Sequence, residues 1–144
     1  MPEKMTEMMP EMSSMLTTGL TLLVYSAILF FIMIVTPLNG KILQKGMLVK
    51  LSGNRDDIPE STGWIARAER ACRNMGETFP IFVALVLTAH SVGISNDNTV
   101  LGAQLYFYGR LAFFPIYVIG IPWVRSVAFG VSVAGMVVIL LQLL

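Results

Sequence analysis

The feature that most constrains this chain is a run of 24 residues, 15–38, that contains no charged side chain. A helix of roughly 20 apolar residues crosses the ~30 Å hydrocarbon core of a bilayer, so the run predicts a membrane-spanning helix. The composition of the 144-residue chain agrees, because 55% of its residues are hydrophobic and 13% are charged, against about 25% charged residues in soluble domains. The mean hydropathy of +0.70 also indicates an integral membrane protein.

Three more segments complete the predicted set of membrane spans: 64–92, 99–119 and 123–144. The first of these begins with charged residues and becomes apolar from Thr78 onward, whereas the other two contain one arginine each, Arg110 and Arg125. Turn-forming residues at 93–98 and 120–122 separate the spans. We therefore expect an all-α, integral membrane four-helix bundle that forms a single domain over all 144 residues.

The distribution of basic residues predicts how these spans are oriented. Loop 40–63 carries four basic residues, and three arginines follow it closely, whereas the turn at 95–98 carries none. Because cytoplasmic loops are enriched in lysine and arginine, we expect the first loop to be cytoplasmic. The start of the second span, the end of the third and the start of the fourth then share the cytoplasmic half. We expect the membrane to be a bacterial inner membrane or an organelle membrane.

The composition argues against several other classes of protein. Ten basic and nine acidic residues leave a formal charge of +1, whereas a nucleic-acid-binding surface is strongly basic. The single cysteine and the single histidine, Cys72 and His90, do not have the spacing of a metal site. We expect neither nucleic acid nor metal as a partner.

Polar residues form one stripe on the second predicted span. At about 100° per residue, Arg67, Arg70, Asn74 and Glu77 fall within about 80° of one another on a helix. A charged side chain deep in a bilayer costs roughly 2.5–3.5 kcal/mol, so ionisable residues within a span favour a functional site. The alternative is that these groups only pair with arginines of neighbouring spans and hold the helices together. For Arg67 and the nearby Glu69, a solvated position at the membrane interface is the better interpretation.

The third and fourth spans add aromatic and basic residues in the same half. Arg110, Phe113, Phe114 and Tyr117 occur at i, i+3, i+4 and i+7, which is one helical face. An aromatic floor can therefore lie beside a guanidinium, although packing alone produces the same pattern. Arg125 stands near the start of the fourth span, where it is either a site residue or an interfacial anchor.

Two segments carry a resemblance to a known family. The segment RACRNMGETFP, residues 70–80, resembles the second-helix signature RxxxNxxExxP of the MAPEG family, the membrane-associated proteins in eicosanoid and glutathione metabolism. RLAFFPIY at 110–117, followed by PWVRSVAF at 122–129, looks like the end of helix three and the start of helix four in that family. The order of these motifs and the four spans extend the resemblance over nearly the whole chain.

The resemblance implies a homotrimer that binds glutathione between neighbouring subunits, near the cytoplasmic side, and takes a lipophilic substrate from the bilayer. The glutathione-binding residues that it implies are Arg70, Asn74, Glu77, Arg110 and Tyr117. Arg70 would hold a carboxylate, and Glu77 the ammonium group or a neighbouring arginine. Asn74 would bind the peptide groups, and Tyr117 would pack and hydrogen-bond against the tripeptide. Arg125 would be the catalytic residue that stabilises the thiolate.

The leading functional hypothesis is a glutathione-dependent transferase or peroxidase that acts on lipophilic electrophiles or lipid hydroperoxides. Thr78 and Phe113 stand where some eicosanoid-forming members have tyrosine, which disfavours eicosanoid synthesis. One alternative is a non-catalytic lipid-binding scaffold of the same fold. Another is a small proton-coupled drug exporter, which the absence of an acidic residue from the run 15–38 makes a poor fit.

Overall fold

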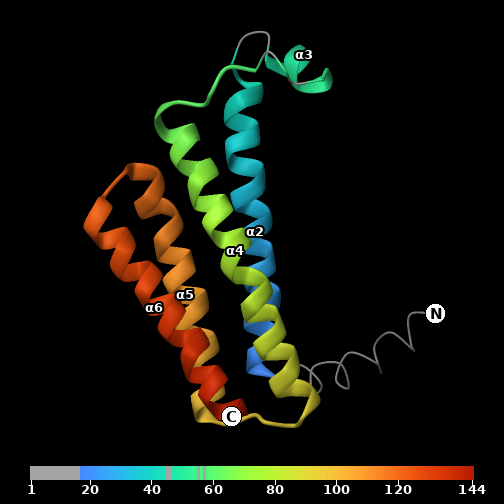
Figure 1. Ribbon diagram of the computed structural model, residues 1–144, viewed down its shortest axis with the longest axis vertical. Coiled ribbons are helices and arrows are strands. Elements are labelled where there is room, and N and C mark those ends of the chain that lie inside the picture. The colour runs from blue at the N-terminus through green and yellow to red at the C-terminus, as the bar shows by residue number, and fades with distance from the viewer. Residues whose placement is uncertain (1–16, 45–46, 55, 57) are drawn as a thin grey trace, which may run out of the picture.

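The structure, a computed structural model, describes residues 17–44, 47–54, 56 and 58–144, and helices are the regular secondary structure of these residues. Its helices are α2 (Thr18–Ile42), α3 (Met47–Ser52), α4 (Gly63–Ser91), α5 (Asp97–Ile119) and α6 (Pro122–Leu143). Figure 1 shows the four long helices running lengthwise beside one another, with α3 set apart at the far end of α2. The prediction of an all-α chain is confirmed.

The helix bounds agree with the predicted spans to within a few residues, except where the sequence signal is weakest. The predicted first span begins at residue 15, and its first two positions lie outside the described residues. The short helix α3 lies in the polar first loop, where no helix was predicted, so the predicted count of four is incomplete. The homotrimer stays a prediction, since the structure contains one chain.

Two helices of the described residues, α2 and α6, are long and apolar enough to cross a membrane. Large hydrophobic side chains on both face outward, including Phe31, Val127 and Leu141, all more than 60% exposed. Apolar surface on this scale is unusual for a soluble monomer and suits contact with lipid or with another subunit.

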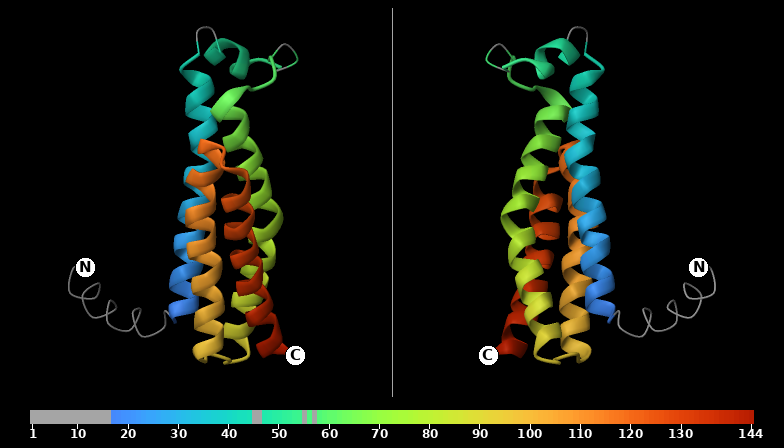
Figure 2. Two further views of the ribbon diagram at one scale, coloured as in Figure 1. Left: turned by 90° about the vertical axis from the view of Figure 1, so that its left-hand side faces the viewer. Right: turned by 90° about the vertical axis from the view of Figure 1, so that its right-hand side faces the viewer.

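The helices α5 and α6 pack against each other more extensively than any other helix pair of the described residues. Figure 2 shows the same helices from two further sides. A Cβ atom on Gly102 would lie 2.6 Å from the carbonyl oxygen of Gly135, so the two backbones approach as closely as they do only because both residues are glycine. Gly120, with a φ of +96°, ends α5 in a left-handed cap. Pro122 then starts α6 at once. This short connection brings the end of α5 next to the start of α6.

The helices meet around a core of large side chains, and among the described residues one charged side chain is buried with them. Met33, Met75 and Phe82 are fully buried, and the Phe82 ring stacks on Tyr106 of α5 at a centroid distance of 3.8 Å. Arg110, one helical turn beyond Tyr106, is also fully buried. Because a buried guanidinium needs compensating contacts, its surroundings define the inner part of the candidate site.

Candidate functional site

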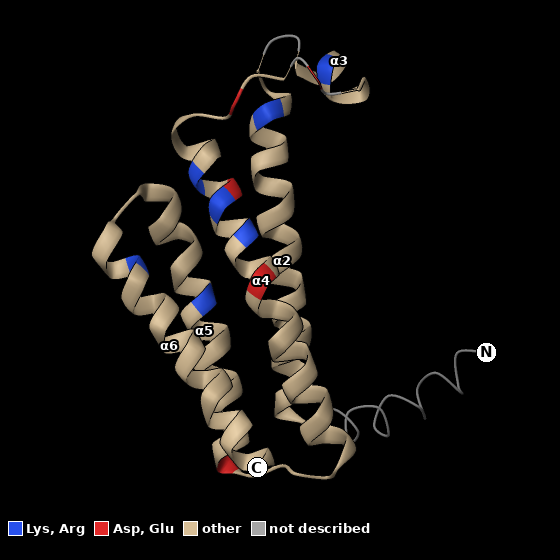
Figure 3. Cartoon of the chain, viewed as in Figure 1, with Lys and Arg blue, Asp and Glu red and all other residues tan. Residues whose placement is uncertain are grey.

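The polar stripe of α4 runs from the helix interface outward. Thr78 is 8% exposed and Asn74 is half-buried, whereas Arg70 and Glu77 are exposed. The charged residues gather mainly in the half of the molecule nearer α3 (Figure 3). The stripe therefore has an inner edge, Asn74 and Thr78, which faces α5. Its outer edge, Arg70 and Glu77, is not covered by other residues of the described chain.

The inner edge of the stripe is bound by Arg110 of α5. Its Nη1 donates to Asn74 Oδ1 at 2.6 Å, and its Nη2 donates to Thr78 Oγ1 at 2.7 Å. The Thr78 hydroxyl also lies 3.4 Å from the Tyr106 hydroxyl, which donates to Met75 Sδ at 3.6 Å. A polar network buried between α4 and α5 is thus built around one guanidinium.

Aromatic rings surround the rest of the Arg110 guanidinium. Its Cζ lies 5.7 Å from the centroid of Tyr106, 5.2 Å from Phe113 and 5.1 Å from Phe129. These distances are within the range of cation–π attraction. Of the aromatic residues predicted beside Arg110, Phe113 contacts its guanidinium. The other two rings, Tyr106 of α5 and Phe129 of α6, were not predicted. Arg110 Nε has no hydrogen-bond partner among the described residues.

The ion pairs differ from those that the sequence suggested. Among the described residues, one ion pair is present, between Lys41 of α2 and Glu69 of α4. The expected pairing of Glu77 with a neighbouring arginine is wrong for a single chain, because Glu77 is exposed and forms no ion pair there. The alternative that the stripe only holds the helices together applies to Asn74, which Arg110 binds, and not to Glu77.

Arg67 and Glu69 are more than solvated interfacial residues. Arg67 is half-buried, and its Nε donates to the backbone carbonyl oxygen of Val118 at 2.7 Å. This bond fastens the first turns of α4 to the last turn of α5. Glu69 forms the ion pair with Lys41. The prediction of a solvated position at the membrane interface is therefore incomplete for both, because each meets a partner from another helix that periodicity along α4 does not reveal.

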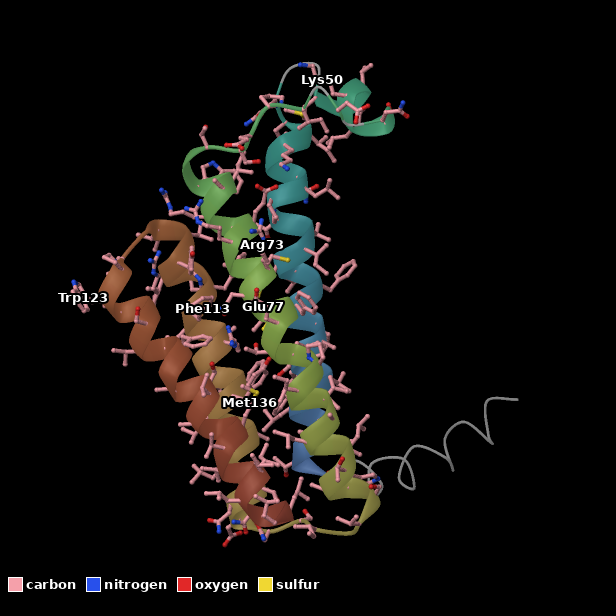
Figure 4. The ribbon with its side chains drawn as sticks, in the orientation of Figure 1. Lys50, Arg73, Glu77, Phe113, Trp123 and Met136 are labelled. Carbon is pink, nitrogen blue, oxygen red and sulfur yellow. The ribbon has the colours of Figure 1, made fainter. Side chains whose placement is uncertain are left out.

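Arg125 and Tyr117 lie together at the junction of α5 and α6. The Arg125 guanidinium carbon is 4.6 Å from the centre of the Tyr117 ring, and both side chains are half-buried. The neighbouring Trp123 is 85% exposed and projects away from the helices (Figure 4). Of the two arginines in these spans, Arg125 is the one whose guanidinium is open to an outside group.

A polar cavity of about 420 Å³ lies beside the first turns of α4. It is lined by residues of α2, the first loop and α4: Lys41, Ile58, Pro59, Glu60, Ser61, Ala66, Glu69, Arg70 and Arg73. Three cationic side chains thus surround it against two acidic ones. Figure 4 shows Arg73 and Glu77 following one another along α4, and Arg70 belongs both to the cavity lining and to the polar stripe. Such a surface can bind carboxylates.

The predicted site residues thus fall into three groups. Asn74 and Arg110 are bonded to each other, and Tyr117 and Arg125 are in contact. The third group consists of Arg70, which lines the polar cavity, and Glu77, which is exposed farther along α4.

Sequence reasoning missed the part that two residues of the network play. The sequence marks Thr78 as the start of the apolar part of its span and as a departure from tyrosine, yet its hydroxyl accepts from Arg110. Tyr106 lies one turn before Arg110, on the same face, which was the available signal.

Comparison with known proteins identifies the family. No curated protein and no solved structure matches this chain. The model of the MAPEG family matches residues 20–144, which covers nearly the whole chain and includes every candidate site residue described above. Together with the two apolar helices, this match indicates a membrane protein. The chain belongs to the MAPEG family.

Proposed function

We propose that this protein is a glutathione-dependent membrane enzyme that transfers the tripeptide to lipophilic electrophiles or uses it to reduce lipid hydroperoxides. Membership of the MAPEG family supports a role in glutathione or eicosanoid metabolism at a membrane. The observation that carries the more specific proposal is the exposure of charged residues on the outer edge of the α4 stripe. Arg70 and Glu77 are exposed on this edge, and Arg70 lines the polar cavity together with Arg73. The helix α4 that carries them packs against the apolar helices α2 and α6.

The residues of this surface fit the functional groups of glutathione. The tripeptide carries two carboxylates, one ammonium group and two peptide units. Arg70 and Arg73 line the cavity and suit carboxylates, because a guanidinium binds a carboxylate through paired hydrogen bonds. Glu77 offers an exposed carboxylate on α4 for the ammonium group or for an arginine of a second subunit. Asn74 and Tyr117 would complete the peptide site.

Arg125 is the proposed catalytic residue. When bound, glutathione would supply a sulfur nucleophile, which is reactive as the thiolate. A fixed positive charge near the sulfur lowers the pKa of the thiol, and this effect is larger in a poorly hydrated site than in water. Arg125 is half-buried and its guanidinium is held over the Tyr117 ring, so its charge is partly desolvated and restricted in position.

We propose that the active assembly is a homotrimer, as in the family that the chain resembles. Exposed charged residues on a helix in the bilayer are unfavourable unless another surface covers them. A neighbouring subunit that packs near Arg70 and Glu77 would enclose the tripeptide between the two chains. The lipophilic substrate would enter from the bilayer, along outward-facing apolar residues of α2 and α6.

We further propose that this site lies on the cytoplasmic side, in a bacterial inner membrane or an organelle membrane. The cavity opens beside the first loop, which carries most of the basic residues between the spans. The enrichment of cytoplasmic loops in lysine and arginine supports this orientation.

Calorimetric titration of the protein, purified in detergent, with glutathione tests the proposal. We expect Arg70→Ala and Glu77→Gln to weaken binding at least about tenfold, the effect of losing one charge-assisted hydrogen bond. Size-exclusion chromatography should show an unchanged oligomer. Asp97→Asn, in the first turn of α5 and at the opposite end of the helices from this site, is the matched control and should bind as the unmodified protein does. No binding at millimolar glutathione would instead favour the lipid-binding scaffold.

A further inference from the structure

The orientation of the Asn74 side chain is determined by its partner. A guanidinium group has only hydrogen-bond donors, whereas an amide has an oxygen that accepts and a nitrogen that donates. Arg110 can therefore face only the oxygen of Asn74, and the 2.6 Å bond from its Nη1 to Asn74 Oδ1 has this arrangement. The amide nitrogen of Asn74 must then point the other way.

That nitrogen is open to a ligand. Within the described residues, Asn74 Nδ2 forms no hydrogen bond, and the buried side-chain nitrogen without a partner is Arg110 Nε. Asn74 Nδ2 is therefore not enclosed by the chain. It lies on the polar stripe between Arg70 and Glu77, on the half-buried residue where the inner edge meets the outer one.

Arg110 itself has little freedom to change this arrangement. It is fully buried, its second amino group donates to Thr78 Oγ1 at 2.7 Å, and three aromatic rings surround its guanidinium. Thr78 is one turn beyond Asn74 on α4, so both acceptors move with the same helix. The two bonds together hold the guanidinium plane, and with it the Asn74 amide.

We infer that Arg110 is a positioning residue that does not touch the bound tripeptide but turns the Asn74 amide so that its NH₂ group faces the site. Asn74 then donates through Nδ2 to a carbonyl or carboxylate oxygen of the ligand, while its oxygen is engaged by Arg110. The inference rests on the proposed glutathione site. It separates Arg110 from the residues that contact the ligand. It also predicts that the ligand atom next to Asn74 is a hydrogen-bond acceptor.

A double-mutant cycle on glutathione affinity tests whether Arg110 acts through Asn74. Glutamine at position 110 can donate or accept, so Arg110→Gln should free the Asn74 amide to turn and weaken binding roughly five- to tenfold. In an Asn74→Ala background the same substitution should change the affinity by less than about twofold. Arg110→Lys retains donors only and should restore most of the affinity. An equal loss in both backgrounds would overturn the inference, since a purely structural role would not depend on Asn74.

A second test asks whether residue 74 donates a hydrogen bond to the ligand or accepts one from it. Asn74→Asp removes both N–H donors and adds a negative charge, so it should bind glutathione no better than Asn74→Ala does. Tighter binding by the aspartate variant than by the alanine variant would show that position 74 accepts a bond from the ligand, and would refute the inference. Thermal unfolding in detergent identifies variants that no longer fold. If the unmodified protein does not bind glutathione, both proposals fail, whereas binding with an additive cycle refutes only the role of Arg110.

Discussion

The contact between Arg125 and Tyr117 leads to a quantitative prediction about thiolate stabilisation. The guanidinium carbon lies 4.6 Å from the ring centre, and both side chains are half-buried. A cation–π contact in such surroundings contributes about 1 kcal/mol, between the values for exposed and desolvated pairs. Tyr117→Leu removes the ring and should leave Arg125 free to move into solvent. Since one pKa unit corresponds to 1.36 kcal/mol, the pKa of bound glutathione should rise by at most about 0.7 units.

The assay is a pH titration of thiolate ultraviolet absorbance for the protein in detergent with saturating glutathione. Tyr117→Phe is the matched control, because it retains the ring and loses only the hydroxyl. We expect the phenylalanine variant to titrate as the unmodified protein does, and the leucine variant to need a higher pH for the same thiolate fraction. An equal rise in both variants would assign the effect to the hydroxyl and refute the argument from the ring.

Two further predictions concern the packing that positions the site. Gly102→Val should destabilise the protein by about 1–3 kcal/mol in thermal unfolding, because its Cβ would meet the Gly135 carbonyl oxygen at 2.6 Å; Gly130→Ala, where the added Cβ meets nothing within 4 Å, should cause no loss. Equal stability of the two variants would contradict the tight α5–α6 approach. Arg67→Met should cost about 1.5 kcal/mol by removing the bond to the Val118 carbonyl, and an unchanged unfolding temperature would show that this bond does not fasten α4 to α5.

The positions of the long helices were predictable because hydropathy and turn residues act locally. The uncharged run of the first span and the turn at 120–122 predict α2 and the α5–α6 junction from neighbouring residues alone. The helix α3 was not predictable in this way, since it lies in a polar loop and buries only Met47.

The contacts of the candidate site were predictable only where they lie on one helix. The contact of Phe113 with Arg110 follows from their spacing on α5, whereas the contact of Tyr106 on the same helix was not predicted. The acceptors of Arg110, Asn74 and Thr78, are on another helix, and which residues meet there depends on the rotation and tilt of α4 relative to α5. The same reason explains why the Lys41–Glu69 pair was missed.

The most direct test of the account is whether Arg125 stabilises the glutathione thiolate. The thiolate absorbance of bound glutathione should be measured at neutral pH for the unmodified protein, for Arg125→Ala and for Arg125→Lys. We expect a clear thiolate signal from the unmodified protein, its loss in the alanine variant while glutathione remains bound by calorimetry, and partial recovery in the lysine variant. Glutathione bound by Arg125→Ala with an undiminished thiolate signal would contradict the central claim.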